Sequence, residues 1–281
     1  MIVIVAVHRS CHTVTNLANC NTIVLIGAYC ICSILSSIFG FHEDWALQQP
    51  GCVFQAFAFL AMPTLISYSY LAQAISRLFF TVFSKHKYLT TYRVHWCLIA
   101  LNWILGILVS TVPFFFDGSF AYEKESRLCL LTSKIFSLSM YAITIGFVIP
   151  LNSSIMIYSI IFHHARRSSR RIVPAISNTI TTYIPNARRE MKLAQNMIMI
   201  ETFYAAAGIP LLVLILWQGI QPKNPPPEPL YLLRMNSISL FGTIMMIMLF
   251  CTNKKVKDIV LSYPYCERRR THPVTINHYQ Q

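Results

Sequence analysis

The feature that most constrains this chain is a run of thirty-two residues, positions 45 to 76, that carries no formal charge. About 20 apolar residues suffice to cross a bilayer as a helix, so this run can span a membrane with some tilt. Arg77 ends the run, and an arginine so close to hydrocarbon needs a partner or an aqueous cavity. Arg77 is therefore a candidate functional residue. The alternative is an arginine that snorkels to the interface and only marks the membrane boundary.

Five further charge-poor runs predict the other complete membrane helices. With 55% hydrophobic and only 12% charged residues, the chain has about half the charge of a soluble domain. In lipid only helices and closed barrels satisfy the backbone, and these runs are far longer than barrel strands. The expected helices cover Val14–Phe39, 94–116, 135–165, Met191–Ile220 and about Leu230–Cys251.

The two ends of the chain complete the predicted architecture. Residues 1–8 are apolar but too short to cross a bilayer. We interpret them as the cytoplasmic end of a first helix whose earlier part is missing. The prediction is an all-α membrane protein, a seven-helix bundle over 1–252 with a stub as its first helix. A cytoplasmic tail over 253–281 then begins with a short amphipathic helix at the interface.

The positive charge follows the sided pattern of a membrane protein. The formal net charge is +13, which could also indicate nucleic-acid binding. Here, however, Lys and Arg gather in alternate segments, chiefly 166–189 and 254–270, whereas the opposite segments hold six of the ten acids. Cytoplasmic loops are rich in Lys and Arg, so the basic segments, including a polar loop from Arg166 to Arg189, are expected in the cytoplasm. The lipid bilayer, and no nucleic acid, is the expected partner.

The nine cysteines contain no C-x-x-C pair, which argues against a zinc site. Cys52 and Cys129 both fall on the predicted extracellular side, where disulfides persist. They could form a bridge that holds the 117–134 loop over the mouth of the bundle, or they could remain unpaired thiols. Cys266, beside three arginines, could be palmitoylated or could be a free cysteine.

The sequence shows no constellation for catalysis or cofactor binding. It contains no paired carboxylates, no glycine-rich phosphate loop and no H-E-x-x-H, so we expect neither an enzyme nor a cofactor. A transporter or channel would need ionisable groups near the middle of several helices, or broken helices in paired halves. Glu201 is the only acid inside an apolar run.

A series of residues spread over most of the chain follows the spacing of a known receptor family. Trp45 lies seven residues before Cys52, and Arg77 lies twenty-five after it. The later helices contribute Trp103 and Pro113, then Phe147, Pro150 and Tyr158, then Glu190, Tyr204 and Pro210. In this order and spacing the chain resembles the rhodopsin-like seven-helix G-protein-coupled receptors, in an orphan invertebrate branch.

The resemblance implies a receptor in the plasma membrane that senses an unknown extracellular ligand and activates a heterotrimeric G protein. It implies a Cys52–Cys129 disulfide and helix kinks at the two prolines of the fifth and sixth helices. It also implies that Arg77, Glu190, Tyr158 and Tyr204 take part in coupling and switching. For Glu190 the alternative is a local pair with neighbouring cations. For the whole chain the alternative is a truncated relic that no longer signals.

Departures from the family pattern affect the switch and the ligand site. The family's Asp-Arg-Tyr reads Ser76-Arg77-Leu78, and the second helix carries no acid. Gly208 stands where the family has a tryptophan two residues before Pro210, and Asn-Pro-x-x-Tyr reads Met245-Met246-Ile247-Met248-Leu249. Phe59 replaces the aspartate of amine receptors, which argues against a biogenic amine. Arg234, near the outer end of the last span, could suit an anionic ligand or could snorkel.

Overall fold

The computed structural model describes residues 13–41, 51–123, 128–132, 135–172, 183–221, 224, 226–253 and 256–259. The first five elements are α2 (Val14–Phe41), α4 (Gly51–Thr81), η2 (Lys87–Thr90), α5 (Tyr92–Thr111) and η3 (Val112–Phe115). The strands β1 (Phe120–Glu123) and β2 (Leu128–Leu131) follow. The chain then continues through α6 (Phe136–Ile143), η4 (Thr144–Val148), α7 (Ile149–Ile172), α8 (Tyr183–Ile220) and α9 (Glu228–Thr252).

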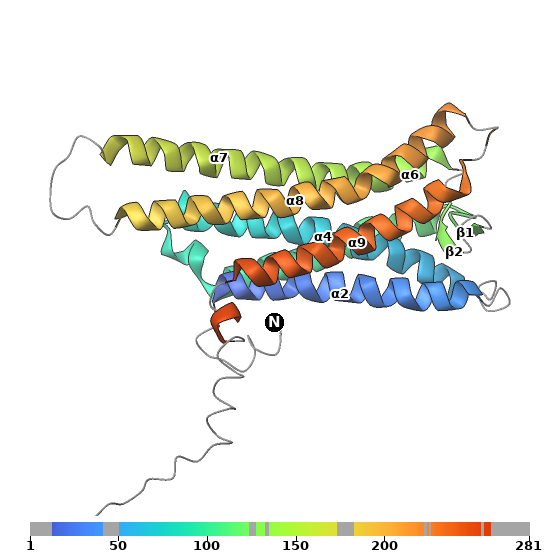
Figure 1. The fold of residues 1–281 in the computed structure, drawn as a ribbon, viewed down its shortest axis with the longest axis horizontal. Coiled ribbons are helices and arrows are strands. Elements are labelled where there is room, and N and C mark those ends of the chain that lie inside the picture. Colours follow the sequence, from blue (N-terminus) through green and yellow to red (C-terminus); the bar gives the residue numbers. More distant parts are fainter. Residues whose placement is uncertain are drawn as a thin grey trace, which may run out of the picture.

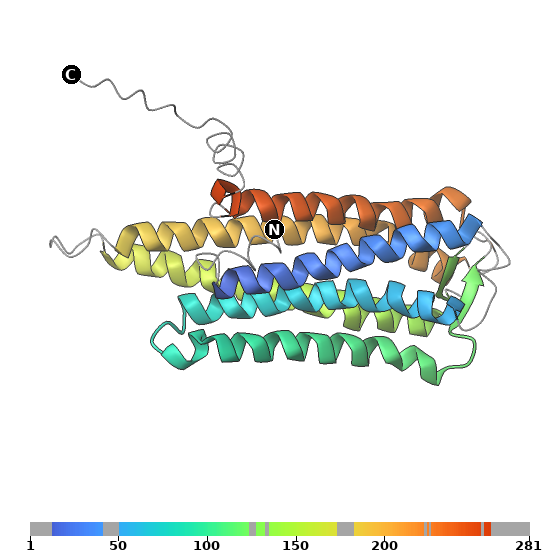
Figure 2. The ribbon, with the colours of Figure 1, turned by 90° about the horizontal axis from the view of Figure 1, so that it is seen from below.

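Six helical stretches among the described residues are long and apolar enough to cross a bilayer. They lie side by side in one elongated bundle (Figures 1 and 2), with the β1–β2 hairpin at one end. Large apolar side chains cover the outer surface, among them Ile31, Ile34, Leu108, Met156, Ile160 and Ile247. Such a surface would be an aggregation hazard in water and is suited to lipid. The prediction of an all-α membrane bundle is confirmed, while the stub at 1–8 and Trp45 lie outside the described residues.

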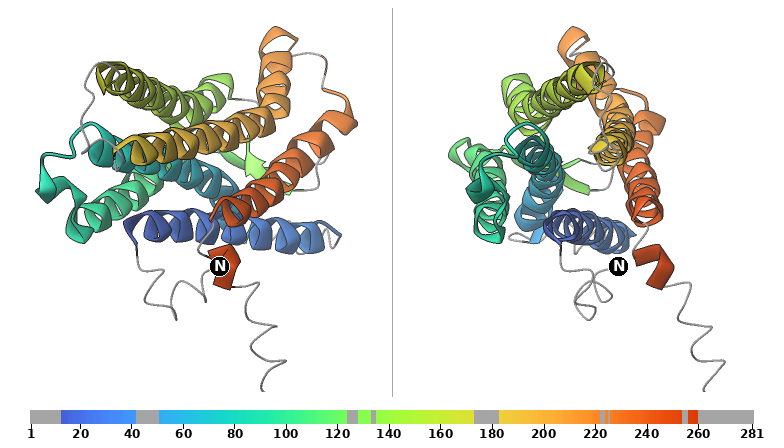
Figure 3. Two further views of the ribbon diagram at one scale, coloured as in Figure 1. Left: turned by 60° about the vertical axis from the view of Figure 1, so that its left-hand side comes forward. Right: turned by 90° about the vertical axis from the view of Figure 1, so that its left-hand side faces the viewer.

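The helix α4 holds the bundle together. It packs against α2, α5, α7 and both strands. In its most apolar stretch 44% of the residues are buried, a larger share than in any other span described. Viewed along the bundle, it lies between α5 and the remaining helices (Figure 3). Small residues allow this close packing. A Cβ added at Gly106 of α5 would lie only 2.5 Å from Leu65 Cδ2, and one at Gly146 only 2.9 Å from Thr64 Oγ1.

The fifth membrane helix, formed by α6, η4 and α7, contains a π-helical segment where proline predicts a kink. Pro150 has no N–H, so the carbonyl of Gly146 loses its α-helical partner, and the proline ring crowds the preceding turn. The five residues of η4, just before Pro150, adopt the wider π-helical geometry. In α8, Pro210 lies inside a helix that continues on both sides of it.

Both helices that flank the basic segment 166–189 are longer than the sequence suggested. The polar loop expected over this whole segment is wrong at both ends, because α7 continues to Ile172 and α8 already begins at Tyr183. The charges end the membrane span but not the helix, since Arg and Lys are good helix formers. Arg166 illustrates this continuation, with its guanidinium 4.0 Å above the ring of Phe162 one turn earlier.

The antiparallel β1–β2 hairpin covers one end of α4. Phe120 pairs with Leu131 and Tyr122 with Cys129. A disulfide joins Cys129 to Cys52, with a Cα–Cα distance of 5.2 Å. The predicted bridge is therefore confirmed. It fixes β2 over the mouth of the bundle, where Leu130 is fully buried.

After α9 the chain changes direction before the short helical segment at 256–259 (Figures 1 and 2). Asn253 shapes this turn: its Nδ2 donates to Asn16 Oδ1 at 2.7 Å, and its Oδ1 accepts from the Val256 N–H at 3.4 Å. Residues 256–259 are helical, and Val256 is fully buried. The rest of the predicted amphipathic segment, with Cys266, lies outside the described residues.

Candidate functional site

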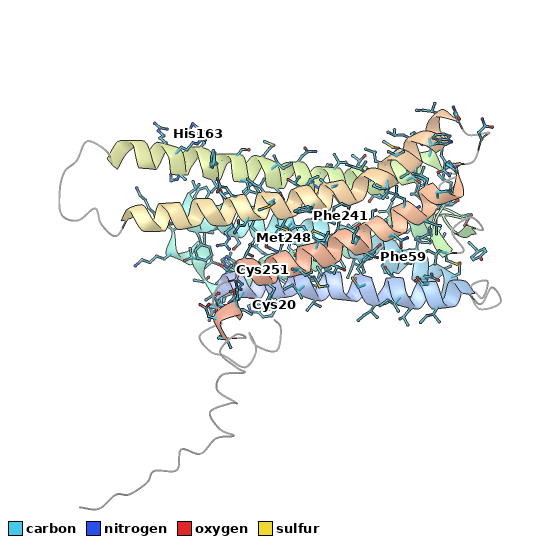
Figure 4. The ribbon with its side chains drawn as sticks, in the orientation of Figure 1. Cys20, Phe59, His163, Phe241, Met248 and Cys251 are labelled. Atoms are coloured by element: carbon cyan, nitrogen blue, oxygen red, sulfur yellow. A yellow bond between two sulfur atoms is a disulfide. The ribbon has the colours of Figure 1, made fainter. Side chains whose placement is uncertain are left out.

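A cavity of about 180 Å³ lies inside the bundle below the hairpin. Side chains from α4, β2, α6, η4, α8 and α9 line it, together with Tyr29 of α2. Apolar and aromatic groups make up most of the lining, and Arg234 is the only charged residue among the described residues that line it. The two ligand candidates from the sequence, Phe59 and Arg234, therefore line one and the same cavity. The ring of Phe59 meets that of Tyr29 edge-on, with centroids 6.0 Å apart, and Figure 4 places Phe59 within the bundle.

Tyr204 of α8 forms the inner end of this cavity and ties three helices together. Its hydroxyl donates to the Pro63 carbonyl of α4 at 2.7 Å and lies 2.9 Å from Ser67 Oγ. Its ring packs against Tyr70 of α4 at 5.5 Å and against Phe147 of η4 at 5.1 Å between centroids. Any molecule in the cavity that contacts Tyr204 thus contacts a residue hydrogen-bonded to the middle of α4.

Gly208 explains how Phe147 reaches the backbone of α8. A Cβ at position 208 would lie 2.8 Å from Phe147 Cζ, so a larger residue would displace this ring. Where the family has a tryptophan, this chain has Gly208, and the ring of Phe147 from the fifth helix occupies the space beside it. Gly208 and Pro210 also place two helix-weakening residues within one turn of α8.

Arg77 lies buried at the other end of α4. It is 8% exposed, which differs from an arginine that snorkels outward to the interface. Tyr158 of α7 is also buried and lies within electrostatic reach of both Arg77 and Glu201. The structure thus places these two predicted switch residues within electrostatic reach of each other. It does not test the predicted contact with Glu190, since the side chains of α8 are described only from Ala194 onward.

Glu201 is a buried acid of α8, only 2% exposed. Among the described residues neither of its carboxylate oxygens has a hydrogen-bond partner. The Ser154 hydroxyl on α7 faces this carboxyl but does not reach good hydrogen-bond geometry. A single buried acid does not make the chain of ionisable groups that a proton or ion pathway uses.

A polar network between α2, α4 and α5 is the main feature that sequence reasoning missed. Trp103 Nε1 donates to Asn21 Oδ1 at 3.1 Å, and Asn21 Nδ2 donates to Ser69 Oγ at 3.3 Å. Thr22 Oγ1 is hydrogen-bonded to Ser69 Oγ and accepts from Gln73 Nε2. The signal in the sequence was Ser69 and Gln73, two polar residues four apart on one face of a membrane helix. Trp103, chosen only as a family marker, is part of this network.

Tyr70 links the middle of α4 to the last helix. Its hydroxyl lies 3.3 Å from Met245 Sδ on α9. Tyr70, Tyr158, Tyr204, Met245 and Leu249 are all buried in one hydrophobic core. The positions that depart from the family's last-helix motif are therefore filled by packed apolar side chains.

Comparisons with known proteins agree with this architecture. The model of the family described as "7 transmembrane receptor (rhodopsin family)" matches residues 1–253. The crystal structure of squid rhodopsin superposes with a TM-score of 0.77 and covers 94% of this chain and 79% of its own. At 17% sequence identity this second likeness is one of fold. No functionally curated protein matches the sequence. Because the family match extends over nearly the whole chain, the protein belongs to the rhodopsin family of seven-transmembrane receptors.

Proposed function

We propose that this multi-pass membrane protein acts at the plasma membrane, where it binds a ligand in the cavity lined by Phe59, Tyr204 and Arg234. Ligand binding then activates a heterotrimeric G protein through a cytoplasmic cleft around Arg77. The position of Tyr204 carries this proposal. Tyr204 lines the cavity and is hydrogen-bonded to α4, the helix whose opposite end presents Arg77.

The proposed switch uses α8 as its moving element. A ligand that contacts Tyr204 or Phe147 changes the bonds between α8 and the Pro63–Ser67 turn of α4. The weak turn at Gly208 and Pro210 lets the cytoplasmic half of α8 swing outward, and Arg77 then becomes accessible to the G protein. A ligand shifts such an equilibrium only by its difference in affinity for the two arrangements. Glu190, on the cytoplasmic part of α8, restrains Arg77 in the resting arrangement.

The receptor function is favoured over a transporter. Transport would require several ionisable groups along a path, whereas Glu201 is the only buried acid of the described bundle. Members of the receptor family are generally not enzymes, so a catalytic role has no support either.

The experiment measures G-protein activation without a known ligand. The receptor and variants are reconstituted in nanodiscs with purified heterotrimers of each Gα class, and nucleotide exchange is recorded. Glu190→Gln removes a resting contact worth about 1 kcal/mol and is expected to raise basal exchange about fivefold. Adding Arg77→Ala to this variant is expected to return exchange to the level of empty nanodiscs. Arg93→Ala, which removes an exposed arginine of α5, is the matched control and leaves exchange unchanged.

Two results would contradict the proposal. Exchange that persists in the Glu190→Gln/Arg77→Ala double variant at equal receptor density would show that Arg77 does not couple to the G protein. Absence of exchange above empty nanodiscs in Glu190→Gln, with every Gα class, would favour a receptor relic that does not signal.

A further inference from the structure

The cavity reaches the outer surface of the bundle between η4 and α8. Three of its lining residues are exposed on that surface, Val148 at 37%, Ile209 at 56% and Leu212 at 39%. The same cavity is lined inside the bundle by Tyr29 and Leu214, which are fully buried. The empty space is therefore continuous from the interior of the protein to a surface that faces lipid.

Small residues line the cavity at this height. Gly146 of η4 and Gly208 and Ala205 of α8 line the cavity at the wall between the two elements. None of them has a side chain larger than a methyl group. The π-helical turn of η4 also interrupts the regular packing of the fifth helix at this point. Phe147 and Thr64 pack against the two glycines, so the opening itself is marked by the exposed lining residues Val148, Ile209 and Leu212.

The opposite, extracellular end of the cavity is covered by the hairpin. Leu130 and Leu131 of β2 are part of the lining. The disulfide between Cys129 and Cys52 ties this strand to α4. A molecule from the aqueous side would meet two leucine side chains on a strand that is held covalently in place.

The lining also defines the kind of molecule that fits. An apolar cavity of roughly 150 Å³ already admits benzene, so a volume of about 180 Å³ suits a small ring system or a branched hydrocarbon segment. Polar partners are few: besides Arg234, the described lining residues offer only the hydroxyls of Tyr29, Thr64, Ser67, Ser139 and Tyr204. A ligand with many polar groups would leave most of them without hydrogen bonds.

We propose that this receptor binds a largely apolar, membrane-soluble ligand that enters from the bilayer through the opening between η4 and α8. The inference rests on the proposed function in one respect: the cavity is taken as the ligand site. It adds the chemical class of the ligand and the route by which it arrives.

Photolabelling in nanodiscs tests the proposal directly. The probe is a diazirine-bearing long-chain alcohol dissolved in the nanodisc lipid, and labelled peptides are mapped by mass spectrometry. Labelling is expected on Pro63, Thr64 and Ser67 of α4, which line the cavity inside the bundle. Ile209→Trp places an indole across the opening and is expected to reduce this interior labelling about tenfold or more. Val148→Trp, which blocks the opposite wall, is expected to have the same effect.

The matched control lies on the same helix. Val213 is 43% exposed and does not line the cavity, so Val213→Trp is expected to leave interior labelling unchanged. Each variant is compared with the unsubstituted receptor by its thermal unfolding midpoint, so that a loss of fold is not mistaken for a blocked route. Labelling confined to exposed residues would show only lipid at the surface and would overturn the proposal.

Interior labelling that survives both Ile209→Trp and Val148→Trp would also overturn it, since the probe would then arrive by another route. Photolabelling needs no G protein, so its outcome is separate from that of the nucleotide-exchange experiment. A receptor that is labelled inside but never activates a G protein would refute the proposed signalling and leave the lateral route intact. A receptor that signals without interior labelling would refute the lateral route and leave the proposed signalling intact.

Discussion

At the scale of single residues, Glu201 is the side chain whose surroundings fit it least well. It is buried in a membrane helix, and among the described residues its carboxyl has no hydrogen-bond partner. Leaving a buried polar group unsatisfied costs about 1–3 kcal/mol. Intramembrane acids are commonly retained for function, and Glu201 lies within reach of Tyr158 and Tyr70 at the proposed switch.

Replacing this acid should therefore stabilise the protein. Glu201→Met keeps a similar volume and removes the unsatisfied carboxyl, so we expect the free energy of unfolding to rise by about 1–3 kcal/mol. Thermal unfolding in detergent would show a midpoint several degrees higher. The control is Thr202→Met at the neighbouring exposed position, where the change should stay within about 0.5 kcal/mol. A lower midpoint for Glu201→Met would mean that the carboxyl has a stabilising partner.

Tyr204 represents the opposite case, a polar group that is well satisfied. Tyr204→Phe keeps the ring contacts with Tyr70 and Phe147 but loses the bonds to Ser67 and Pro63. Interhelical hydrogen bonds in membranes contribute about 1 kcal/mol each, so a loss of about 1–2 kcal/mol in unfolding free energy is expected. Tyr141→Phe, which removes a single bond of 3.4 Å to Val109, should cost less.

A double-mutant cycle separates the hydrogen bond from other effects of Tyr204→Phe. Combined with Ser67→Ala, the loss should be smaller than the sum of the two single losses, because both changes remove the same bond. Full additivity in thermal unfolding would show that Ser67 and Tyr204 do not interact in the folded protein.

At the scale of elements, the contact between α4 and α5 depends on a glycine. A Cβ at Gly106 would fall 2.5 Å from Leu65 Cδ2, and Leu65 is itself fully buried. Overpacking of this kind costs about 1–3 kcal/mol, which exceeds the gain of about 1 kcal/mol in helix propensity from Gly to Ala. A small residue at this position is thus a requirement of helix packing.

Two glycine substitutions with opposite expected signs test this packing. Gly106→Ala should lower the unfolding midpoint in detergent, with a net loss of about 1–2 kcal/mol. Gly27→Ala in α2 meets no atom within 4 Å, and should raise the midpoint through helix propensity alone. Equal shifts for the two variants would show that α5 and α4 do not approach as closely as described.

At the scale of the whole molecule, the charge distribution and the bundle give one orientation. The hairpin with its disulfide lies at one end of the bundle, and the basic ends of α7 and α8 lie at the other (Figure 1). Disulfides persist on the oxidising side of a membrane, and Lys and Arg are retained on the cytoplasmic side. Two independent principles therefore predict that the hairpin lies outside and that the basic ends of α7 and α8 lie inside.

Epitope tags test this orientation in cells. A tag at Ser177, between α7 and α8, should stain only after permeabilisation. A tag at Gly118, in the turn before β1, should stain on intact cells. Staining of the Ser177 tag on intact cells would reverse the orientation and, with it, the assignment of Arg77 to a cytoplasmic cleft.

The membrane spans could be predicted from the sequence because they depend on local properties, whereas the disulfide was predicted from the family resemblance. A span requires only enough apolar length to cross lipid, so the expected Val14–Phe39 agrees closely with the observed α2. The expectation failed at residues 166–189, since charge ends a span without ending a helix. Cys52 and Cys129 followed from their sidedness and from the family spacing.

Only the tertiary structure decided which buried groups meet. The bonds of Tyr204 to Pro63 and of Trp103 to Asn21 depend on how each helix is rotated and how closely its neighbours approach. No local pattern encodes that rotation, because small residues such as Gly106 and Gly208 set it through contacts with residues far away in the chain. The lateral opening has the same origin. Apolar residues in a span can face lipid, packing or a cavity, and only the assembled bundle distinguishes these three surroundings.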